Sequence, residues 1–331
     1  MTSSQTGAPA DGAVGPGLLT FGETMAVVIA DQPGHLASAR SFGLGIGGAE
    51  SNVAMAVARL GVPAAWVGRV GTDASGELVE QRVAAAGVRV TAVRDRSFTG
   101  IMVRHRPVGA SIHVDYHRAG SAGSRLCPDD VSEDLVRTSG VVHVTGITPA
   151  LSESARATVQ HAIDAATATG VPVSLDVNYR AKLWSPAAAR PVLRDLARRV
   201  DVLFAGVDEA QLVLDAPGAD TSALLRGLAA LGPREVVLKD GARGCTALVD
   251  GVELAEPAVA VAVVDPVGAG DAFVAGYLAE RLAGVDLADR LRTAVASGAY
   301  AVGVPGDCDS VPTREQLQRL AAATAEPVVV R

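Results

Sequence analysis

Aromatic residues and cysteines are scarce in this 331-residue chain, and long apolar runs are missing. Aromatic side chains make up only 3% of the sequence, which argues against a surface that stacks the bases of single-stranded nucleic acid. The three cysteines, Cys127, Cys245 and Cys308, lack metal-ligand spacing, so we expect free thiols in a reducing cytosol. No stretch reaches the roughly 18 uncharged residues that a membrane span needs. We therefore expect a cytoplasmic protein that binds no membrane.

The rest of the composition is that of one large globular domain. Apolar residues account for 49% of the chain and charged residues for 20%, which is enough apolar material for a sizeable core. The formal charge of −7 argues against a general nucleic-acid surface. Residues 1–17 are rich in Gly, Ala, Ser and Pro and carry no signal-peptide pattern. We expect a disordered tail at 1–17 and a single domain over 18–331.

From Gly140 onward, near-continuous apolar strands alternate with amphipathic helices. The strands are expected at 141–146, 171–177, 201–206 and 234–241, with helices at 152–170, 186–199 and 221–232. This alternation predicts an α/β fold of Rossmann-like type, in which a mostly parallel central sheet is covered by helices on both faces. Ligands of such sheets bind beyond the carboxyl ends of the strands.

One segment departs from this alternation. Residues 99–118, TGIMVRHRPVGASIHVDYHR, alternate apolar and polar side chains around a Pro-Val-Gly-Ala turn, which predicts a β-hairpin. Together with residues 35–46, the region 94–118 is expected to form a small β-sheet lid that interrupts the main domain.

Glycine spacing offers one alternative function. The segment GLGIGG contains Gly43, Gly45 and Gly48 in the G-x-G-x-x-G spacing of dinucleotide-binding folds. The preceding ASARSF is not a buried strand, so the context that this motif requires is poor. An NAD-dependent dehydrogenase remains a remote alternative, and the Walker A pattern is absent from the sequence.

A second glycine-rich stretch, DPVGAGDAF, has a better context. Residues 258–264 are expected to form a strand and residues 271–284 a helix, so Gly268, Ala269 and Gly270 would lie at a helix N-terminus. Free N–H groups and the helix dipole create an anion site at such an end. Asp271 then has two possible roles, because it could cap the helix or turn its carboxylate toward a bound ligand as a base.

At this point the sequence resembles a known family. Residues 265–278, DPVGAGDAFVAGYL, resemble the C-terminal signature of the ribokinase-like (PfkB) carbohydrate kinases. Residues 45–61 and 68–76, GIGGAESNVAMAVARLG and GRVGTDASG, resemble the N-terminal signature, about 200 residues earlier. Within the family, the segments PGHL, GGAESNVA, YHRAGSAGS, GITPAL and SLDVNYRAKLW look like those of 2-keto-3-deoxygluconate kinases.

The resemblance implies a ribokinase-like three-layer fold and phosphoryl transfer from ATP to a sugar hydroxyl with Mg²⁺; a monovalent cation such as K⁺ is a further candidate. It assigns the base to Asp271 and the anion hole to Gly268, Ala269 and Gly270. A carboxylate with an ordinary pKa is ionised at pH 7 and can accept the hydroxyl proton. Kinases of neutral sugars or nucleosides, and a sugar-binding regulator that has lost catalysis, remain alternatives.

The substrate side contains two arginines that suit a sugar acid. Tyr116 and Arg118 lie two residues apart on the expected lid strand and so share a face, and the resemblance places Arg180 on the opposite side. An arginine fork suits the carboxylate of a keto-deoxy sugar acid, although either arginine could instead be an ordinary surface residue. The other sugar contacts that the resemblance implies are Gly48, Asn52, Ile147 and Asp307.

The resemblance also implies a nucleotide site and a homo-oligomer, a dimer or larger, paired through the lid. Glu209 would organise magnesium through water. Three residues depart from the family pattern, namely Gly206, Val295 and Met102. The residues implied to contact ATP are Asn178, Arg180, Lys239, Gly241, Arg243 and Gly244, together with Gly268 and Gly270.

Overall fold

The computed structural model describes residues 17–108, 112–304, 306 and 311–325. The predicted tail lies outside this range except for Gly17, and so do Asp307 and Cys308. Every helix in the described part of the chain is too short or too polar to cross a bilayer.

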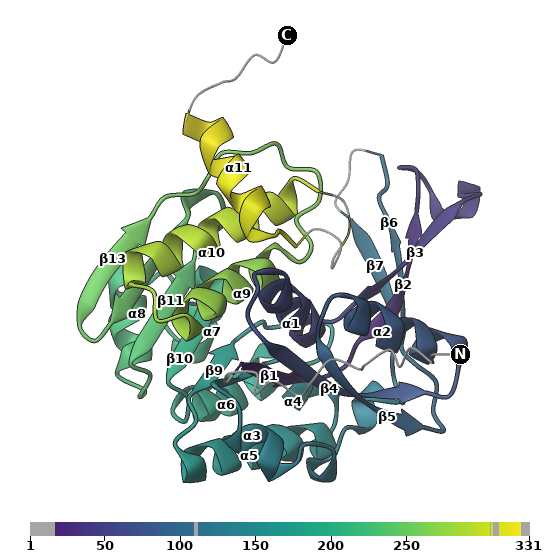
Figure 1. The fold of residues 1–331 in the computed structure, drawn as a ribbon, viewed down its shortest axis with the longest axis horizontal. Helices are drawn as coiled ribbons and strands as arrows, with labels where there is room; N and C mark the ends of the chain where they lie inside the picture. The colour runs from purple at the N-terminus through teal and green to yellow at the C-terminus, as the bar shows by residue number, and fades with distance from the viewer. Residues whose placement is uncertain (1–16, 109–111, 305, 307–310, 326–331) are drawn as a thin grey trace, which may run out of the picture.

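A nine-stranded sheet forms the centre of the molecule (Figure 1). All pairings from β5 across to β11 are parallel, and the last two strands join antiparallel at one edge. The strands, in spatial order, are β13 (Val252–Glu256), β12 (Cys245–Val249), β11 (Glu235–Lys239), β10 (Val202–Gly206), β9 (Val173–Asp176), β8 (Val141–Thr145), β1 (Leu18–Phe21), β4 (Ala64–Gly71) and β5 (Arg89–Asp95).

Helices cover both faces of this sheet because its strands are apolar on both sides. In β1, Leu19 and Phe21 enter one core and Leu18 enters the other. The first core is closed by α3 (Glu133–Arg137), α5 (Glu153–Thr169), α6 (Pro186–Ala197), α7 (Val207–Leu214) and α8 (Thr221–Ala229). The second is closed by α1 (Ala49–Arg59), α2 (Ala74–Ala85), α9 (Ala269–Leu282) and α10 (Leu287–Val302). The predicted three-layer α/β fold is confirmed. The short α4 (Thr148–Leu151) follows β8, and α11 (Arg314–Ala325) packs on α10.

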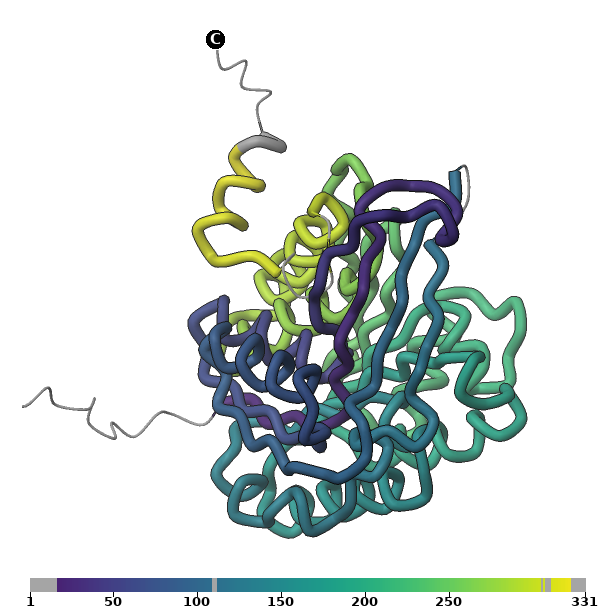
Figure 2. Tube along the Cα trace, turned by 90° about the vertical axis from the view of Figure 1, so that its right-hand side faces the viewer, coloured from purple at the N-terminus to yellow at the C-terminus, as the bar shows by residue number. Residues whose placement is uncertain are grey.

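A separate four-stranded sheet stands beside α2, away from the large sheet (Figure 1 and Figure 2). Its order is β3 (Phe42–Gly47), β2 (Met25–Ala30), β6 (Ile101–His105) and β7 (His113–His117). Strands β6 and β7 pair antiparallel, which confirms the predicted hairpin. Strand β2 also belongs to this sheet, whereas Arg94 and Asp95 end β5 of the large sheet. We call β2, β3, β6 and β7 the small sheet.

The strand predicted at 258–264 is wrong. This segment has no regular secondary structure, and the side chains of Val263 and Val264 are exposed. Alternating Val and Ala favour a strand, but the chain has already left the sheet after β13 and crosses to α10. There the backbone N–H groups of Val264 and Asp265 both donate to the carbonyl of Val302, at 2.7 and 3.0 Å.

Candidate active site

Helix α9 begins at Ala269, two residues earlier than predicted, and its N-cap is Gly268. Gly268 has φ of +79°, a left-handed conformation that favours glycine, and no side chain caps this helix. Asp271 therefore lies in the first turn and is not the cap. The first-turn N–H groups and the positive end of the helix dipole are left for a ligand anion, as expected for an anion hole.

Two asparagines hold the Asp271 carboxylate from different elements. Asn52, on α1, donates to Oδ2 at 2.9 Å, and Asn178, directly after β9, donates to Oδ1 at 3.5 Å. Asn52 lies one turn beyond Gly48, the N-cap of α1, as the sequence indicated. Its own Oδ1 is buried and has no hydrogen-bond partner among the described residues, which leaves an acceptor for a ligand hydroxyl.

Burial changes the acidity of Asp271. It raises the pKa of this carboxyl to about 7, helped by the negative charge of Asp176 and opposed by Asn52, Arg180 and Lys239. The sequence-based expectation of an ordinary pKa is therefore wrong, because the fold buries Asp271, which is only 8% exposed. A carboxyl poised near neutral pH is well matched to general base catalysis.

A positive charge lies beside the first turn of α9. Lys239 ends β11, and its Nζ is 2.8 Å from both carboxylate oxygens of Asp176, at the end of β9. A Cβ built on Gly270 would lie 3.7 Å from this Nζ. Burial acts to lower the pKa of Lys239, but Asp176, Glu209 and Asp271 outweigh it and raise that pKa, so the ammonium stays charged.

The turn between β11 and β12 is the tight turn that the sequence indicated. Gly241 and Gly244 have φ of +54° and +96°, and a Cβ on Gly244 would lie 2.1 Å from the carbonyl oxygen of Glu256. Arg243 is exposed and pairs with Asp240, Nε to Oδ2 at 2.7 Å. Local structure thus accounts for these glycines, and their contact with ATP stays a prediction.

Glu209 ties two loops together. Its Oε2 accepts from the N–H of Gly206 at 2.7 Å and its Oε1 from the N–H of Tyr179 at 2.8 Å, so the carboxylate closes the start of α7. No cluster of three or more His, Cys, Asp or Glu side chains suited to a metal occurs in the described part of the chain. Mg²⁺ is commonly bound through one or two carboxylates together with substrate phosphates and water, and a carboxylate such as that of Glu209 could take part in such a site.

A cavity of about 970 Å³ opens between the small sheet and the carboxyl ends of the large sheet's strands. The small sheet contributes Met25, Val27, Met102, Arg104 and Tyr116 to its lining. Of the predicted sugar contacts, those that line it are Gly48, Asn52, Tyr116, Arg118, Ile147, Arg180 and Asp271. The predicted ATP contacts that do not line it are Asn178, Lys239, Gly241, Arg243, Gly244 and Gly270, and Asp307 lies outside the described residues.

Arg118 is already paired with a residue that the sequence did not single out. Its Nε donates to Oε2 of Glu23 at 2.7 Å, and Glu23 also accepts from the Ser121 hydroxyl. The guanidinium lies 5.8 Å from the Tyr116 ring centre, and the ammonium of Lys182, also unpredicted, lies 5.5 Å from it. Glu23 follows the buried strand β1 at its carboxyl end, a position that could have marked it.

Glu50 is a second unpredicted carboxylate in the lining. It accepts from the hydroxyls of Thr145 and Thr148, at 2.7 and 2.6 Å, and burial raises its pKa.

The three residues that depart from the family pattern lie in different parts of the structure. Met102 faces the cavity opposite Tyr116, Val295 packs in the core with α9, and Gly206 is the N-cap of α7.

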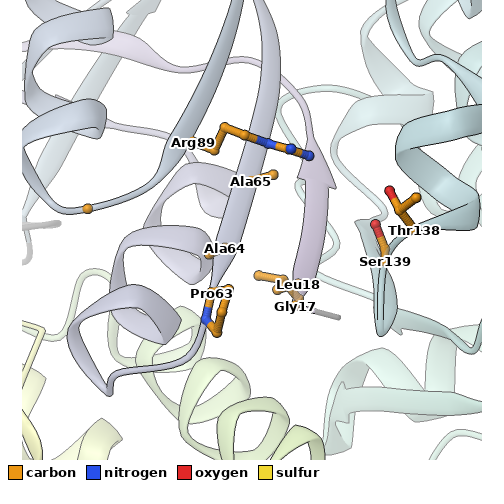
Figure 3. A pocket seen from close by; sticks show the side chains of 9 residues that line it. Gly17, Leu18, Pro63, Ala64, Ala65, Arg89, Thr138 and Ser139 are labelled. Carbon is orange, nitrogen blue, oxygen red and sulfur yellow. The ribbon is translucent and has the colours of Figure 1, made fainter. Parts of the chain in front are cut away.

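A second cavity, of about 340 Å³, lies at the amino end of β1 and β4 (Figure 3) and shares no lining residue with the first. Arg89, Thr138 and Ser139 supply its polar side chains. No predicted site residue lines it.

Comparisons with known proteins agree with this arrangement. The family model for pfkB family carbohydrate kinases matches residues 16–314. The 2-dehydro-3-deoxygluconokinase of Bacillus subtilis is 34% identical over 92% of this chain and 95% of its own length. The 2-dehydro-3-deoxygalactonokinase of Haloferax volcanii is also 34% identical, over 92% of this chain and 96% of its own length. The structure of a Xylella fastidiosa fructokinase with bound ATP is similar, with a TM-score of 0.81 and 25% sequence identity. The match covers 93% of this chain and 99% of the fructokinase chain.

The raised pKa of Asp271 predicts a pH-dependent stability cost. The folded state keeps this proton up to about pH 7, whereas the unfolded chain releases it near pH 4, so folding loses stability as pH rises between these values. Asp271→Asn removes the effect. Its stability advantage over the wild type should widen by roughly 2 kcal/mol between pH 5.5 and pH 8, measured by urea denaturation. In Asp134→Asn, which changes an exposed carboxylate on α3, the difference should stay flat.

Proposed function

The chain belongs to the pfkB family of carbohydrate kinases, and we propose that it transfers the γ-phosphoryl group of ATP to a hydroxyl of 2-keto-3-deoxygluconate or a close keto-deoxy sugar acid. ATP-dependent sugar phosphorylation is the activity of the family. The observation that supports a sugar acid is the concentration of cationic side chains around one cavity that ends at Asp271.

Two of the cations that line the cavity, Arg180 and Lys182, have no ion-pair partner among the described residues. Arg118 is balanced by Glu23. Arg180 is exposed and its side chain has no ion pair or hydrogen bond within the described residues, and the Lys182 ammonium donates to the carbonyl of Val114, at 2.7 Å. A carboxylate entering between these groups would gain charge-assisted hydrogen bonds, whereas a neutral sugar would not.

We assign the chemistry to residues at the start of α9. Asp271 would orient the sugar hydroxyl and accept its proton, while the N–H groups of the Gly268–Gly270 turn and the Lys239 ammonium would stabilise charge on the transferred phosphoryl group. Mg²⁺, when bound with the nucleotide, would neutralise further phosphate charge, and Glu209 would reach it through water. Arg180 could serve the sugar carboxylate or the ATP phosphates, and Asp307 stays a proposed sugar contact.

The alternatives are less well supported by the geometry. In the segment GLGIGG, Gly43 and Gly45 lie inside strand β3 of the small sheet, not in a turn between a buried strand and a helix, which weighs against an NAD site. A regulator without catalysis would have no need of a buried carboxyl with a pKa near neutrality. Kinases of neutral sugars remain the nearest alternative, since a fructokinase shares the fold.

We also propose a cytoplasmic location and a homo-oligomer of two or more copies. The exposed side chains of Phe42 and Leu44 on the edge strand of the small sheet support a contact between copies. A monovalent cation such as K⁺ stays a proposed cofactor, tested by comparing activity in KCl with activity in choline chloride.

A panel of purified sugars tests the substrate. With ATP and Mg²⁺, 2-keto-3-deoxygluconate or its galacto epimer should be phosphorylated with a kcat/KM at least about 100-fold above ribose and fructose, since an acid-specific site leaves its cations unpaired with a neutral sugar. Turnover of ribose or fructose without turnover of the acids would refute the substrate. Thermal stabilisation by NAD alone would refute a kinase.

The base is tested by Asp271→Asn. This change should lower kcat by about 100-fold to 10,000-fold, because proton acceptance is lost. Binding of the sugar acid, measured by calorimetry, should change little, since Asn52 can still donate to the new amide oxygen. Full turnover in this variant would show that Asp271 is not the base.

The carboxylate contact is tested by Arg118→Ala. This change should raise the KM for sugar acids about 10-fold or more while altering that for neutral sugars little. Arg118→Ala leaves the buried Glu23 carboxylate without its ion-pair partner. The double variant Glu23→Gln/Arg118→Ala is therefore measured as well, to separate an effect on sugar affinity from an effect on folding. Arg125→Ala, on an exposed residue, is the matched control. Equal losses on acidic and neutral sugars would contradict a carboxylate role.

A further inference from the structure

Two arginines of the small sheet reach across to the loop that precedes α9. Arg104, on β6, forms an ion pair with Asp265. Arg106, just beyond β6, donates from Nη2 to the carbonyl of Val264 at 2.7 Å. The first contact is buried, with Arg104 6% exposed and Asp265 2% exposed, and the second lies at the surface.

Asp265 shapes the loop that leads into the first turn of α9. Its Oδ1 accepts from the N–H of Val267 at 3.1 Å, and its Oδ2, which pairs with Arg104, also accepts from the N–H of Gly306 at 3.3 Å. The residue that follows Val267 is Gly268, the N-cap of α9. The orientation of the Asp265 carboxylate therefore sets the path of the backbone that enters the Gly268–Gly270 turn.

Arg104 joins this loop to the sugar cavity. It lines the cavity beside Met102 and Tyr116, and it stands opposite Val114 in the β6–β7 pairing. A buried ion pair contributes little net stability, because desolvation opposes the attraction, but its geometry fixes the groups it joins. Here one group belongs to the sheet that covers the cavity and the other to the loop before the anion hole.

We propose that Arg104 is a positioning residue, which holds the residue 265–270 turn in its phosphate-binding geometry when the small sheet covers the cavity. This inference rests on the proposed role of the Gly268–Gly270 turn. It makes the position of the small sheet and the shape of the anion hole interdependent. Arg104 acts through Asp265 and does not contact the transferred group.

The test compares three single variants. Arg104→Met keeps the length of the side chain and removes the charge, Arg104→Lys keeps a charge that can reach Asp265, and Arg106→Met is the matched control on the exposed crossing. With whichever sugar the wild type phosphorylates, Arg104→Met should lower kcat about 10-fold to 100-fold, as expected for a small misplacement of reacting groups. The dissociation constant for the sugar should change less than about threefold. Arg104→Lys should recover part of kcat, and Arg106→Met should stay within about threefold of the wild type.

Hydrogen exchange followed by mass spectrometry gives a readout that needs no substrate. Amides of residues 263–272 should exchange faster in Arg104→Met and in Asp265→Asn than in the wild type or Arg106→Met. The first change removes the partner of the carboxylate that accepts from Val267, and the second removes the carboxylate itself. The double variant Arg104→Met/Asp265→Asn should have a kcat no lower than the worse single variant, because both remove the same contact.

Two outcomes would overturn the proposal. If Arg104→Met weakened sugar binding by as much as it lowered kcat/KM and left the amide exchange of residues 263–272 unchanged, Arg104 would be a substrate contact. Additive losses in the double variant would show that it acts independently of Asp265. If Arg104→Met does not fold, the lysine and Asp265→Asn variants carry the same test. Failure of the sugar panel would leave the exchange result standing, so the two proposals fail separately.

Discussion

The enclosure of the Asp271 carboxyl at the uncapped first turn of α9 is the constraint on which the site depends. Burial favours the neutral acid, so the surroundings have to hold the group without removing its ability to accept a proton. Asn52 and Asn178 supply the hydrogen bonds, from α1 and from the end of β9. Asn178 reaches the carboxyl because β9 ends at the carboxyl edge of the parallel sheet, and Asn52 reaches it because α1 packs along α9.

Charge around this carboxyl is arranged in pairs that join distant segments. Asp176 holds Lys239, Glu23 holds Arg118, and Asp265 holds Arg104. Each pair fixes a cation that would otherwise be a mobile side chain, and two of the three connect the small sheet or the loop after it to the main domain. The cations lining the cavity that have no ion-pair partner among the described residues are Arg180 and Lys182. An anionic ligand is the natural complement of such a site.

The sequence predicted those features that local pattern controls. Apolar strands alternating with helices specified the large sheet, and the Gly48 to Asn52 spacing specified one turn of α1. Contacts between remote residues left no such pattern. Glu23 and Arg118 are 95 positions apart, and Arg104 and Asp265 are 161 apart. The strand expected at 258–264 failed for a related reason, because alternation of Val and Ala does not reveal whether a neighbouring strand is available.

The two glycines of the Gly268–Gly270 turn are present for different reasons. Gly268 is required by the backbone, because φ of +79° disfavours any side chain. Gly270 lies in the ordinary right-handed helix, and a Cβ there would meet only the end of Lys239 at 3.7 Å, an ordinary contact. Nothing in the packing of the protein demands a glycine at 270, and glycine in a helix costs stability relative to alanine. The proposed phosphate, approaching the backbone beside the Lys239 ammonium, would account for a glycine at this position.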